Sequence, residues 1–145
     1  MPLAPDQPLL QDYCGTCTKC IDACPTNAIL PNKEVDGSQC ISYFTIELKS
    51  ALLPDHLKEQ SQNWIFGCDI CQDVCPWNRF SKPNQHKELE PIAPILHFTI
   101  QDWLSIDKPT FNTIFKDSPL KRSKWEGMQR NLGNYKKIII PNEKL

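Results

Sequence analysis

Two cysteine runs decide the fold of this chain: CGTCTKCIDACP at residues 14–25 and CDICQDVCP at residues 68–76. The first run has the spacing C-x2-C-x2-C-x3-C-P, and the second repeats its last three cysteines and its proline. Three thiolates two residues apart wrap a tight loop around one metal centre. The fourth comes after a further turn, where the proline directs the chain away, so it points to a neighbouring centre.

The spacing is that of the bacterial ferredoxin run, in which the fourth cysteine ligates the other cluster. The second run lacks its first cysteine, because position 65 is Ile65, and Cys40 is the cysteine left to replace it. We therefore predict two [4Fe–4S] clusters with crossed ligation. Cluster one is expected to take Cys14, Cys17, Cys20 and Cys75, and cluster two to take Cys24, Cys40, Cys68 and Cys71.

Other uses of the cysteines explain the pattern less well. Two zinc sites would use C-x2-C pairs and leave unexplained both the third cysteine of the first run and the two prolines. A disulfide framework needs an oxidising compartment, yet the first thirty residues contain no apolar stretch of a secretory signal. No apolar stretch approaches the roughly 20 residues of a membrane span. We expect a cytoplasmic protein that does not enter a membrane.

The charge is divided unevenly along the 145 residues. Residues 1–76 carry four lysines against ten acidic residues, a net charge of −6, and residues 77–145 carry a net charge of +5. The basic excess is densest from Lys116 to Lys137. Such a run forms either an ordinary solvated face or a surface that contacts phosphates. The candidate RNA contacts in it are Lys121, Arg122, Lys124 and Arg130.

The fold class that we predict is α+β, mostly helical and irregular, with a weak strand signal. Apolar spacing predicts a helix over 41–52, and Pro54 begins a second, through about residue 62. Further helices are expected from Thr99 to Leu104, from Pro109 to Phe115, and from Ser118-Pro119 towards Asn131, with Gly133 as a C-cap. The expected domains are a 2[4Fe–4S] ferredoxin-like module at 1–80, with a helical insertion at 41–67, and a helical region at 81–145.

Several stretches resemble the tRNA epoxyqueuosine reductase family. They are DYCG at 12–15, CPT at 24–26, CISYFTIE at 40–47 and GCDICQDVCPWNRF at 67–80. SPLKR at 118–122 and Arg130-Asn131 are similar to that family as well. The resemblance extends from about residue 2 to residue 134 and is densest over 12–80.

The resemblance implies a cytosolic oxidoreductase that reduces the epoxide of epoxyqueuosine to queuosine in the tRNA anticodon. Its cofactors would be cobalamin and two [4Fe–4S] clusters, one of them near the corrin. Its partners would be the tRNA anticodon stem-loop and an electron donor. Ser42 and Asp69 would contact cobalamin, and residues 81–145 would be the truncated start of a HEAT-like helical part.

The sequence departs from the family pattern in ways that affect the expected activity. The cobalamin domain, which holds the family's proton donor, is missing, so no catalytic residue is assigned. Arg130-Asn131 also runs directly into Leu132-Gly133-Asn134, without the usual residues between them. We interpret the chain as a fragment or split gene product. We expect it to be a monomer that is inactive without a separate cobalamin domain.

Two other functions remain open from the sequence. A stand-alone 2[4Fe–4S] ferredoxin-type electron carrier would explain the clusters, but neither the insertion nor the basic region. A reductive dehalogenase fragment would share cobalamin and two such clusters. However, that family is normally exported, and residues 40–46 and 77–80 favour the tRNA enzyme. We interpret Trp77, Trp103 and Trp125 as core or surface anchors.

Overall fold

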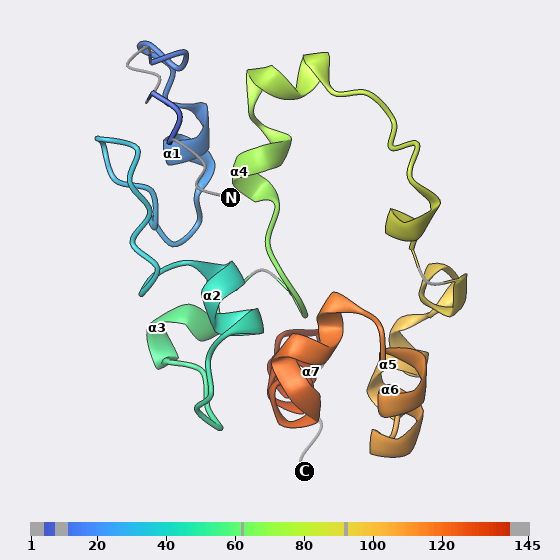
Figure 1. The fold of residues 1–145 in the computed structure, drawn as a ribbon. Coiled ribbons are helices and arrows are strands. Elements are labelled where there is room, and N and C mark those ends of the chain that lie inside the picture. Colours follow the sequence, from blue (N-terminus) through green and yellow to red (C-terminus); the bar gives the residue numbers. More distant parts are fainter. Residues whose placement is uncertain (1–4, 8–11, 62, 92, 140–145) are drawn as a thin grey trace.

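A computed structural model describes residues 5–7, 12–61, 63–91 and 93–139 of the chain (Figure 1). These residues are mostly helical and irregular, and their β-structure is limited to one isolated antiparallel bridge between Ile29 and Val35. The α-helices are α1 (Lys19–Ala23), α2 (Ile41–Ile46), α3 (Asp55–Lys58), α4 (Ile70–Asp73), α5 (Ile100–Ser105), α6 (Lys108–Ile114) and α7 (Lys124–Ile139). The 3-10 helices are η1 (Pro76–Phe80), η2 (Lys87–Leu89), η3 (Ala93–His97) and η4 (Pro119–Ser123).

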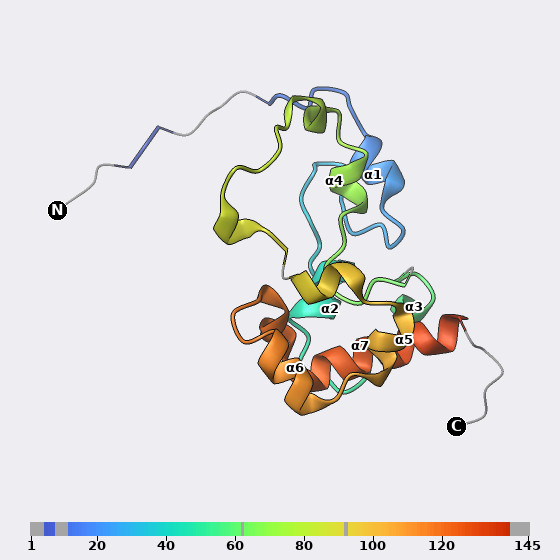
Figure 2. The same cartoon turned by 90° about the vertical axis from the view of Figure 1, so that its right-hand side faces the viewer.

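The helices form two lobes, joined by the segment that carries η2 and η3 (Figure 2). In the cluster lobe, residues 12–40 and 67–80, α1 packs against α4. In the helical lobe, residues 41–66 and 98–139, α2 packs against α7 and η4. The insertion after Cys40 thus lies with the C-terminal helices rather than with the cysteine runs that flank it in sequence.

The two cysteine runs have the same local geometry at their last cysteine. Cys24 ends α1 with φ −70° and ψ 114°, and Cys75, which follows α4, has φ −71° and ψ 121°. Each precedes a proline, whose ring excludes helical geometry from the preceding residue and makes it extended. Each short helix therefore ends before its cysteine, α1 at Ala23 and α4 at Asp73, and the chain turns out of its own run.

The helical lobe is built around an aromatic core. Phe111, Phe115, Met128 and Leu132 are buried on α6, α7 and the turn between them. Trp103 stacks on Phe115 with ring centroids 5.7 Å apart and ring planes 6° apart. Phe44, Leu53 and Leu57 bury a second, smaller cluster within the insertion. Trp103 and Trp125 both pack against the aromatic core, as the sequence suggested.

Polar side chains of α7 connect this core to the insertion. Asn131 is 2% exposed, and its amide donates hydrogen bonds of 2.8 Å to the carbonyls of both Thr45 and Ile65. The Thr45 hydroxyl in turn accepts a 3.0 Å hydrogen bond from the N–H of Gly67. Thr45 follows Cys40 by five residues, and Gly67 directly precedes Cys68. Asn131 and Thr45 therefore set the spacing between two segments that lead into cysteines.

Arg130, the neighbour of Asn131, binds the end of α2. Its guanidinium donates to the carbonyls of Phe44, Leu48 and Ser50 at 2.6, 2.7 and 2.9 Å. These carbonyls would otherwise continue the helix or face solvent, so Arg130 takes the role of a C-cap. This explains why α2 ends at Ile46, although apolar spacing predicted a helix through residue 52.

Other helix limits also differ from the expected ones. α3 ends at Lys58, whose carbonyl accepts from the amide of Asn134 at 3.2 Å; Gln62, the expected end, lies outside the described residues. The helix expected from Ser118-Pro119 is divided into η4 and α7 at Lys124, where φ is +57°. Gly133 does not cap α7, because the helix continues to Ile139.

The capping signals were more reliable. Thr99 is the N-cap of α5 and forms a capping box with Asp102. α6 begins at Lys108, one residue earlier than expected, because the Asp107 side chain accepts from the N–H of Thr110. None of the helices in the described part of the chain combines the length and apolar character needed to cross a bilayer.

We predict that Asn131→Ala lowers the free energy of unfolding by about 2 kcal/mol, because it leaves the carbonyls of Thr45 and Ile65 without their donor in a buried place. Urea unfolding of the reconstituted, anaerobic protein, followed by circular dichroism, measures the change. Gln129→Ala is the matched control, since Gln129 is exposed on the same helix; its effect should stay under about 0.5 kcal/mol. Equal effects of the two changes would contradict the role of Asn131.

Candidate metal centres

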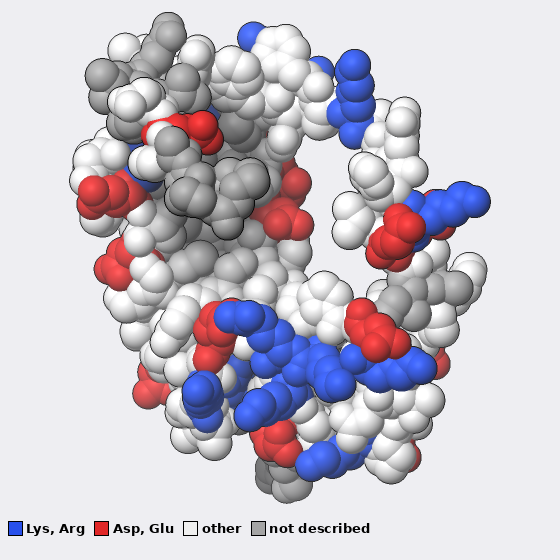
Figure 3. Space-filling model, in the orientation of Figure 1, with Lys and Arg blue, Asp and Glu red and all other residues white. Residues whose placement is uncertain are grey.

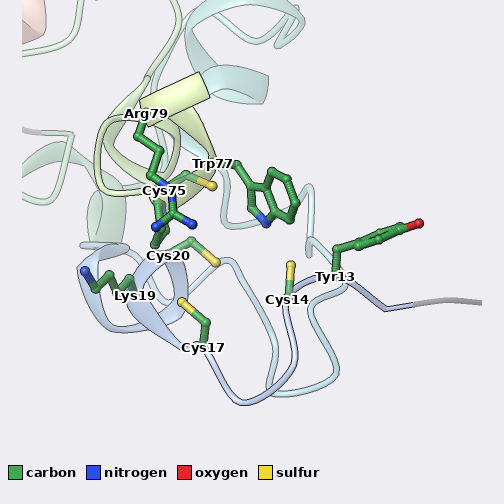
Figure 4. A pocket seen from close by; sticks show the side chains of 9 residues that line it. Tyr13, Cys14, Cys17, Lys19, Cys20, Cys75, Trp77 and Arg79 are labelled. Atoms are coloured by element: carbon green, nitrogen blue, oxygen red, sulfur yellow. The ribbon is translucent and has the colours of Figure 1, made fainter. Parts of the chain in front are cut away.

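The first cysteine-lined cavity lies between α1 and the start of η1 and has a volume of about 210 Å³. Four thiols face it: three from the first run and one from the end of the second (Figure 4). The remaining lining residues come from the same two segments. The full lining is Tyr13, Cys14, Cys17, Lys19, Cys20, Cys75, Pro76, Trp77 and Arg79.

The loop that carries the first cysteines is held by an ion pair. The carboxylate of Asp12 accepts the N–H of Cys14 at 2.8 Å and the ammonium of Lys33 at 2.9 Å. Lys33 also donates to the carbonyl of Gly15 at 2.9 Å. Gly15 has φ +52°, a conformation that glycine adopts without a steric penalty. The hydrogen bond with Asp12, followed by the charges of Asp12, Cys14 and Cys17, raises the pKa of Lys33.

The second cavity has a volume of about 310 Å³ and lies between the first run, the start of α2 and α4. Four thiols line it as well: Cys24 comes from the first run, and Cys40, Cys68 and Cys71 come from the insertion boundary and the second run. Ser42 and Asp69 belong to the same lining, with Asp69 as the only charged side chain in it. The other lining residues are Pro25, Thr26, Ala28, Ile29, Val35, Ile41, Ile70 and Gln72.

The thiols of the second cavity differ in their electrostatic surroundings. Burial alone would raise the pKa of Cys24, but hydrogen bonds from Thr26 and from the N–H of Ala28 outweigh it and lower that pKa. The Ala28 N–H lies 3.2 Å from the Cys24 sulfur. Burial, followed by the like charges of neighbouring cysteines, raises the pKa of Cys68 and Cys71. The hydrogen-bond donors that lower the pKa of Cys24 would also stabilise its sulfur as a metal-bound thiolate.

The two sets of thiols fit a cluster better than a single ion. A zinc ion would draw its four sulfurs to about 2.3 Å from one point. Within the described ranges, no three His, Cys, Asp or Glu side chains converge closely enough to hold one ion. Instead, each group of four surrounds a cavity of a few hundred cubic ångströms. Such a donor set suits a cuboidal iron–sulfur group, which places its irons apart from one another.

The expected RNA contacts lie on the other lobe. Lys121, Arg122 and Lys124 are exposed at η4 and the start of α7, and Lys and Arg side chains gather across this part of the surface (Figure 3). Arg122 also forms an ion pair with Glu47 of α2's C-terminal boundary. Arg130 is different, because its guanidinium is occupied by three backbone carbonyls and by Asn131. We therefore leave Arg130 out of the candidate RNA surface.

Sequence reasoning missed several residues at the cavities. Lys19 and Arg79 are the charged side chains of the first cavity, and neither belongs to a metal-ligand pattern. Tyr13 and Trp77 flank the same cavity, where Trp77 is exposed. Their positions next to the first and last cysteine of one ligand set could have indicated this. Asn131 had no such signal, because its partners are backbone groups far away in sequence.

Comparison with known proteins identifies the cysteine-rich part. Residues 13–78 match the family of the 4Fe-4S double cluster binding domain. The cofactors of this part of the chain are therefore two [4Fe–4S] clusters.

The similarity to known proteins extends beyond the cysteine-rich part. It is 60% identical, over 132 residues, to an epoxyqueuosine reductase of Cyclobacterium marinum, covering 91% of this chain and 41% of that protein. A crystal structure of selenomethionine-labelled epoxyqueuosine reductase superimposes with a TM-score of 0.79 at 34% identity, over 92% of this chain and 35% of that one. A structure of the reductase with an epoxyqueuosine-modified tRNA-Tyr stem loop gives a TM-score of 0.76 at 36% identity, over 93% and 35%. Over most of its length the chain is similar to epoxyqueuosine reductases, and it spans about two fifths of the length of the curated relatives that it matches.

Proposed function

We propose that this chain is the iron–sulfur electron-transfer part of a cobalamin-dependent tRNA epoxyqueuosine reductase, which reduces epoxyqueuosine to queuosine in the tRNA anticodon. The observation that carries the proposal is the arrangement of two four-thiol cavities side by side, each completed by a cysteine of the other run. The names of the relatives supply the reaction. A stand-alone ferredoxin and a dehalogenase fragment are not favoured by those names.

In this proposal, Cys14, Cys17, Cys20 and Cys75 hold one [4Fe–4S] cluster, and the four thiols of the second cavity hold the other. Bound clusters of this kind supply one-electron transfer. The residues of the chain set their environment. Thr26 and the N–H of Ala28 donate to the Cys24 sulfur, and such hydrogen bonds to sulfur tune the reduction potential.

The second cavity is the side that would face cobalamin. Ser42 and Asp69 both line it and present a hydroxyl and a carboxylate beside the thiols. Cobalamin would supply the reactive metal centre that acts on the epoxide, as the family resemblance implies. Ser42 and Asp69 would orient its corrin side groups, while a separate domain would hold most of the cofactor.

The anticodon stem-loop would approach over the helical lobe. Lys121, Arg122 and Lys124 are exposed there and carry positive charge, which favours contact with phosphates. The structure of the reductase with a tRNA stem loop, which superimposes on nearly all of this chain, supports a tRNA partner.

The proposal includes the organisation of the chain. Residues 1–80 would form a ferredoxin-like module with the insertion 41–67, and residues 81–145 the start of a HEAT-like helical part. The matching geometry of Cys24 and Cys75 supports a module of two related halves. A cytoplasmic location agrees with eight free thiols and a tRNA substrate. That the chain acts as a monomer stays a prediction.

Metal analysis after anaerobic reconstitution tests the core of the proposal. We expect about eight irons and eight sulfides per chain, because eight thiolates complete two cubanes. Two zinc ions without acid-labile sulfide would contradict the proposal.

The crossed ligand sets make a separate prediction. Cys75→Ala should change the same electron paramagnetic resonance signal as Cys14→Ala, and Cys24→Ala should change the same signal as Cys68→Ala, because each pair lines one cavity. Iron should fall to about half in each variant. If Cys24→Ala and Cys14→Ala removed the same signal, the crossing would be wrong.

The RNA surface predicts a change in salt dependence. Replacing Lys121, Arg122 and Lys124 by Gln together should weaken binding of an epoxyqueuosine-modified stem-loop. The log–log salt slope should fall by about 2, since each lost phosphate contact removes about 0.7–0.9. A double variant, Lys82→Gln with Lys87→Gln, removes exposed charge elsewhere and should leave the slope almost unchanged. An unchanged slope in the triple variant would identify the basic run as ordinary solvated surface.

The last expectation for this function is that the 145 residues alone do not turn over. Reduction of the epoxide to the alkene consumes two electrons and two protons and releases water. In the proposed ligand sets every iron carries a cysteine, and no residue of this chain is assigned as the acid for the leaving oxygen. Single-turnover assays with dithionite and cobalamin should show no queuosine, whereas adding a separately expressed cobalamin domain should restore it. Queuosine formed without that domain would contradict the assignment.

A further inference from the structure

The surroundings of the two cavities are electrostatically opposite. Lys19 and Arg79 are the charged residues that line the first cavity, whereas Asp69 is the one that lines the second. Because both would hold anionic thiolate-bound clusters, this difference comes from the protein. An anionic partner is therefore repelled less at the first cavity than at the second.

Exposed aromatic rings surround the first cavity on the same side. Tyr13, Trp77 and Phe80 are 56%, 50% and 59% exposed. Tyr13 meets Trp77 edge-on with centroids 5.9 Å apart, and Trp77 lies 5.4 Å from Phe80. The guanidinium of Arg79 stands 4.6 Å from the centre of the Phe80 ring. Three large exposed rings in one contiguous group are unusual on a free surface and typical of the centre of an interface.

The rings and the cations frame the thiols directly. In Figure 4, Trp77 and Tyr13 lie on one side of the four sulfurs, and Lys19 and Arg79 lie on the other. We call these four residues, together with Phe80, the aromatic rim. Of the nearby acids, Asp12 is paired with Lys33, whereas Asp22 accepts a hydrogen bond from the Thr18 hydroxyl and keeps its negative charge. Asp73 on α4 remains as an exposed acid of this lobe.

We propose that electrons enter the chain at the first cavity and that the aromatic rim is the docking surface for an acidic protein electron carrier. This inference rests on the proposed function, because it requires a cluster behind the rim. One electron passes from the reduced carrier to the group held by Cys14, Cys17, Cys20 and Cys75. No bond forms or breaks, and the carrier is oxidised by one electron for each electron transferred.

Single-stranded RNA is the other polymer that aromatic rings and cations can bind. The position of the rim favours the electron carrier, because Tyr13, Trp77, Lys19 and Arg79 line a thiol cavity, and electron transfer requires close approach to it. The exposed basic residues of η4 and α7, in contrast, lie on the other lobe.

The test uses the reconstituted chain and reduced flavodoxin, a small acidic flavin protein, as the probe. Lys19→Glu with Arg79→Glu reverses both rim charges, and Trp77→Ala removes the central ring. Lys49→Glu with Lys116→Glu is the matched control, since both lysines are exposed and lie outside the rim. Calorimetry gives the flavodoxin affinity at two salt concentrations, and stopped-flow absorbance gives the rate of cluster reduction by flavodoxin and by dithionite.

We expect the rim reversal and Trp77→Ala each to lower flavodoxin affinity and the rate of reduction by flavodoxin about tenfold or more. The iron content should stay near that of the unmodified chain in every variant. Reduction by dithionite should be unchanged in Trp77→Ala and should slow far less than reduction by flavodoxin in the charge reversal, and the control variant should behave like the unmodified chain. The reversal should also remove most of the salt dependence, because that dependence comes from rim charges.

The outcomes separate the two claims. A chain without about eight irons refutes the proposed function itself. A fully loaded chain that flavodoxin does not bind, or reduces equally well in all variants, overturns only the docking inference. If the rim variants instead lose affinity for the epoxyqueuosine stem-loop and retain that for flavodoxin, the rim is an RNA surface and the inference is wrong.

Discussion

The packing of α1 against α4 is the contact on which the cysteine arrangement depends. Each of these helices is too short to be stable alone, and each ends before a cysteine that the following proline makes extended. Because the two helices lie together, the cysteine that leaves one run arrives at the cavity of the other. Neither cavity has its four thiols unless both runs fold, so the two sites are formed cooperatively.

The second cavity depends on the helical lobe as well. Its cysteine at position 40 begins α2, and Cys68 follows the segment that returns from the insertion. The Asn131 amide donates hydrogen bonds to a carbonyl of each segment, and the Thr45 hydroxyl accepts a hydrogen bond from the N–H of Gly67. Gly67 has φ +74°, which lets its N–H turn towards Thr45. The missing cysteine at position 65 is thus replaced by a distant one, and α7 keeps that distant cysteine in place.

These contacts mark what could and could not be read from the sequence. The ferredoxin spacing of the runs and the remaining Cys40 predicted two groups of four cysteines, and the same groups line the two cavities. That each group binds a cluster stays a prediction. Thr99 was predicted as a cap because capping acts over a few residues. The end of α2 and the continuation of α7 past Gly133 were not predictable, because Arg130 and Asn134 act on carbonyls about eighty residues away. Arg130 also shows that a basic residue in a basic run can stabilise the fold by binding backbone carbonyls.

The charged side chains beside the two cavities have opposite signs, so the two proposed clusters are not equivalent for electron transfer. Lys19 and Arg79 stand beside thiols that are partly exposed, whereas Asp69 and buried neighbours such as Thr26 and Ala28 surround the second set. A cluster near cations is easier to reduce than one near a carboxylate, other factors being equal. Hydrogen bonds to the Cys24 sulfur act against this difference, because they stabilise added negative charge at the second site. In the proposed transfer of electrons from the first cluster to the second, the donors to Cys24 would lower the electrostatic barrier at the site where Asp69 opposes added negative charge.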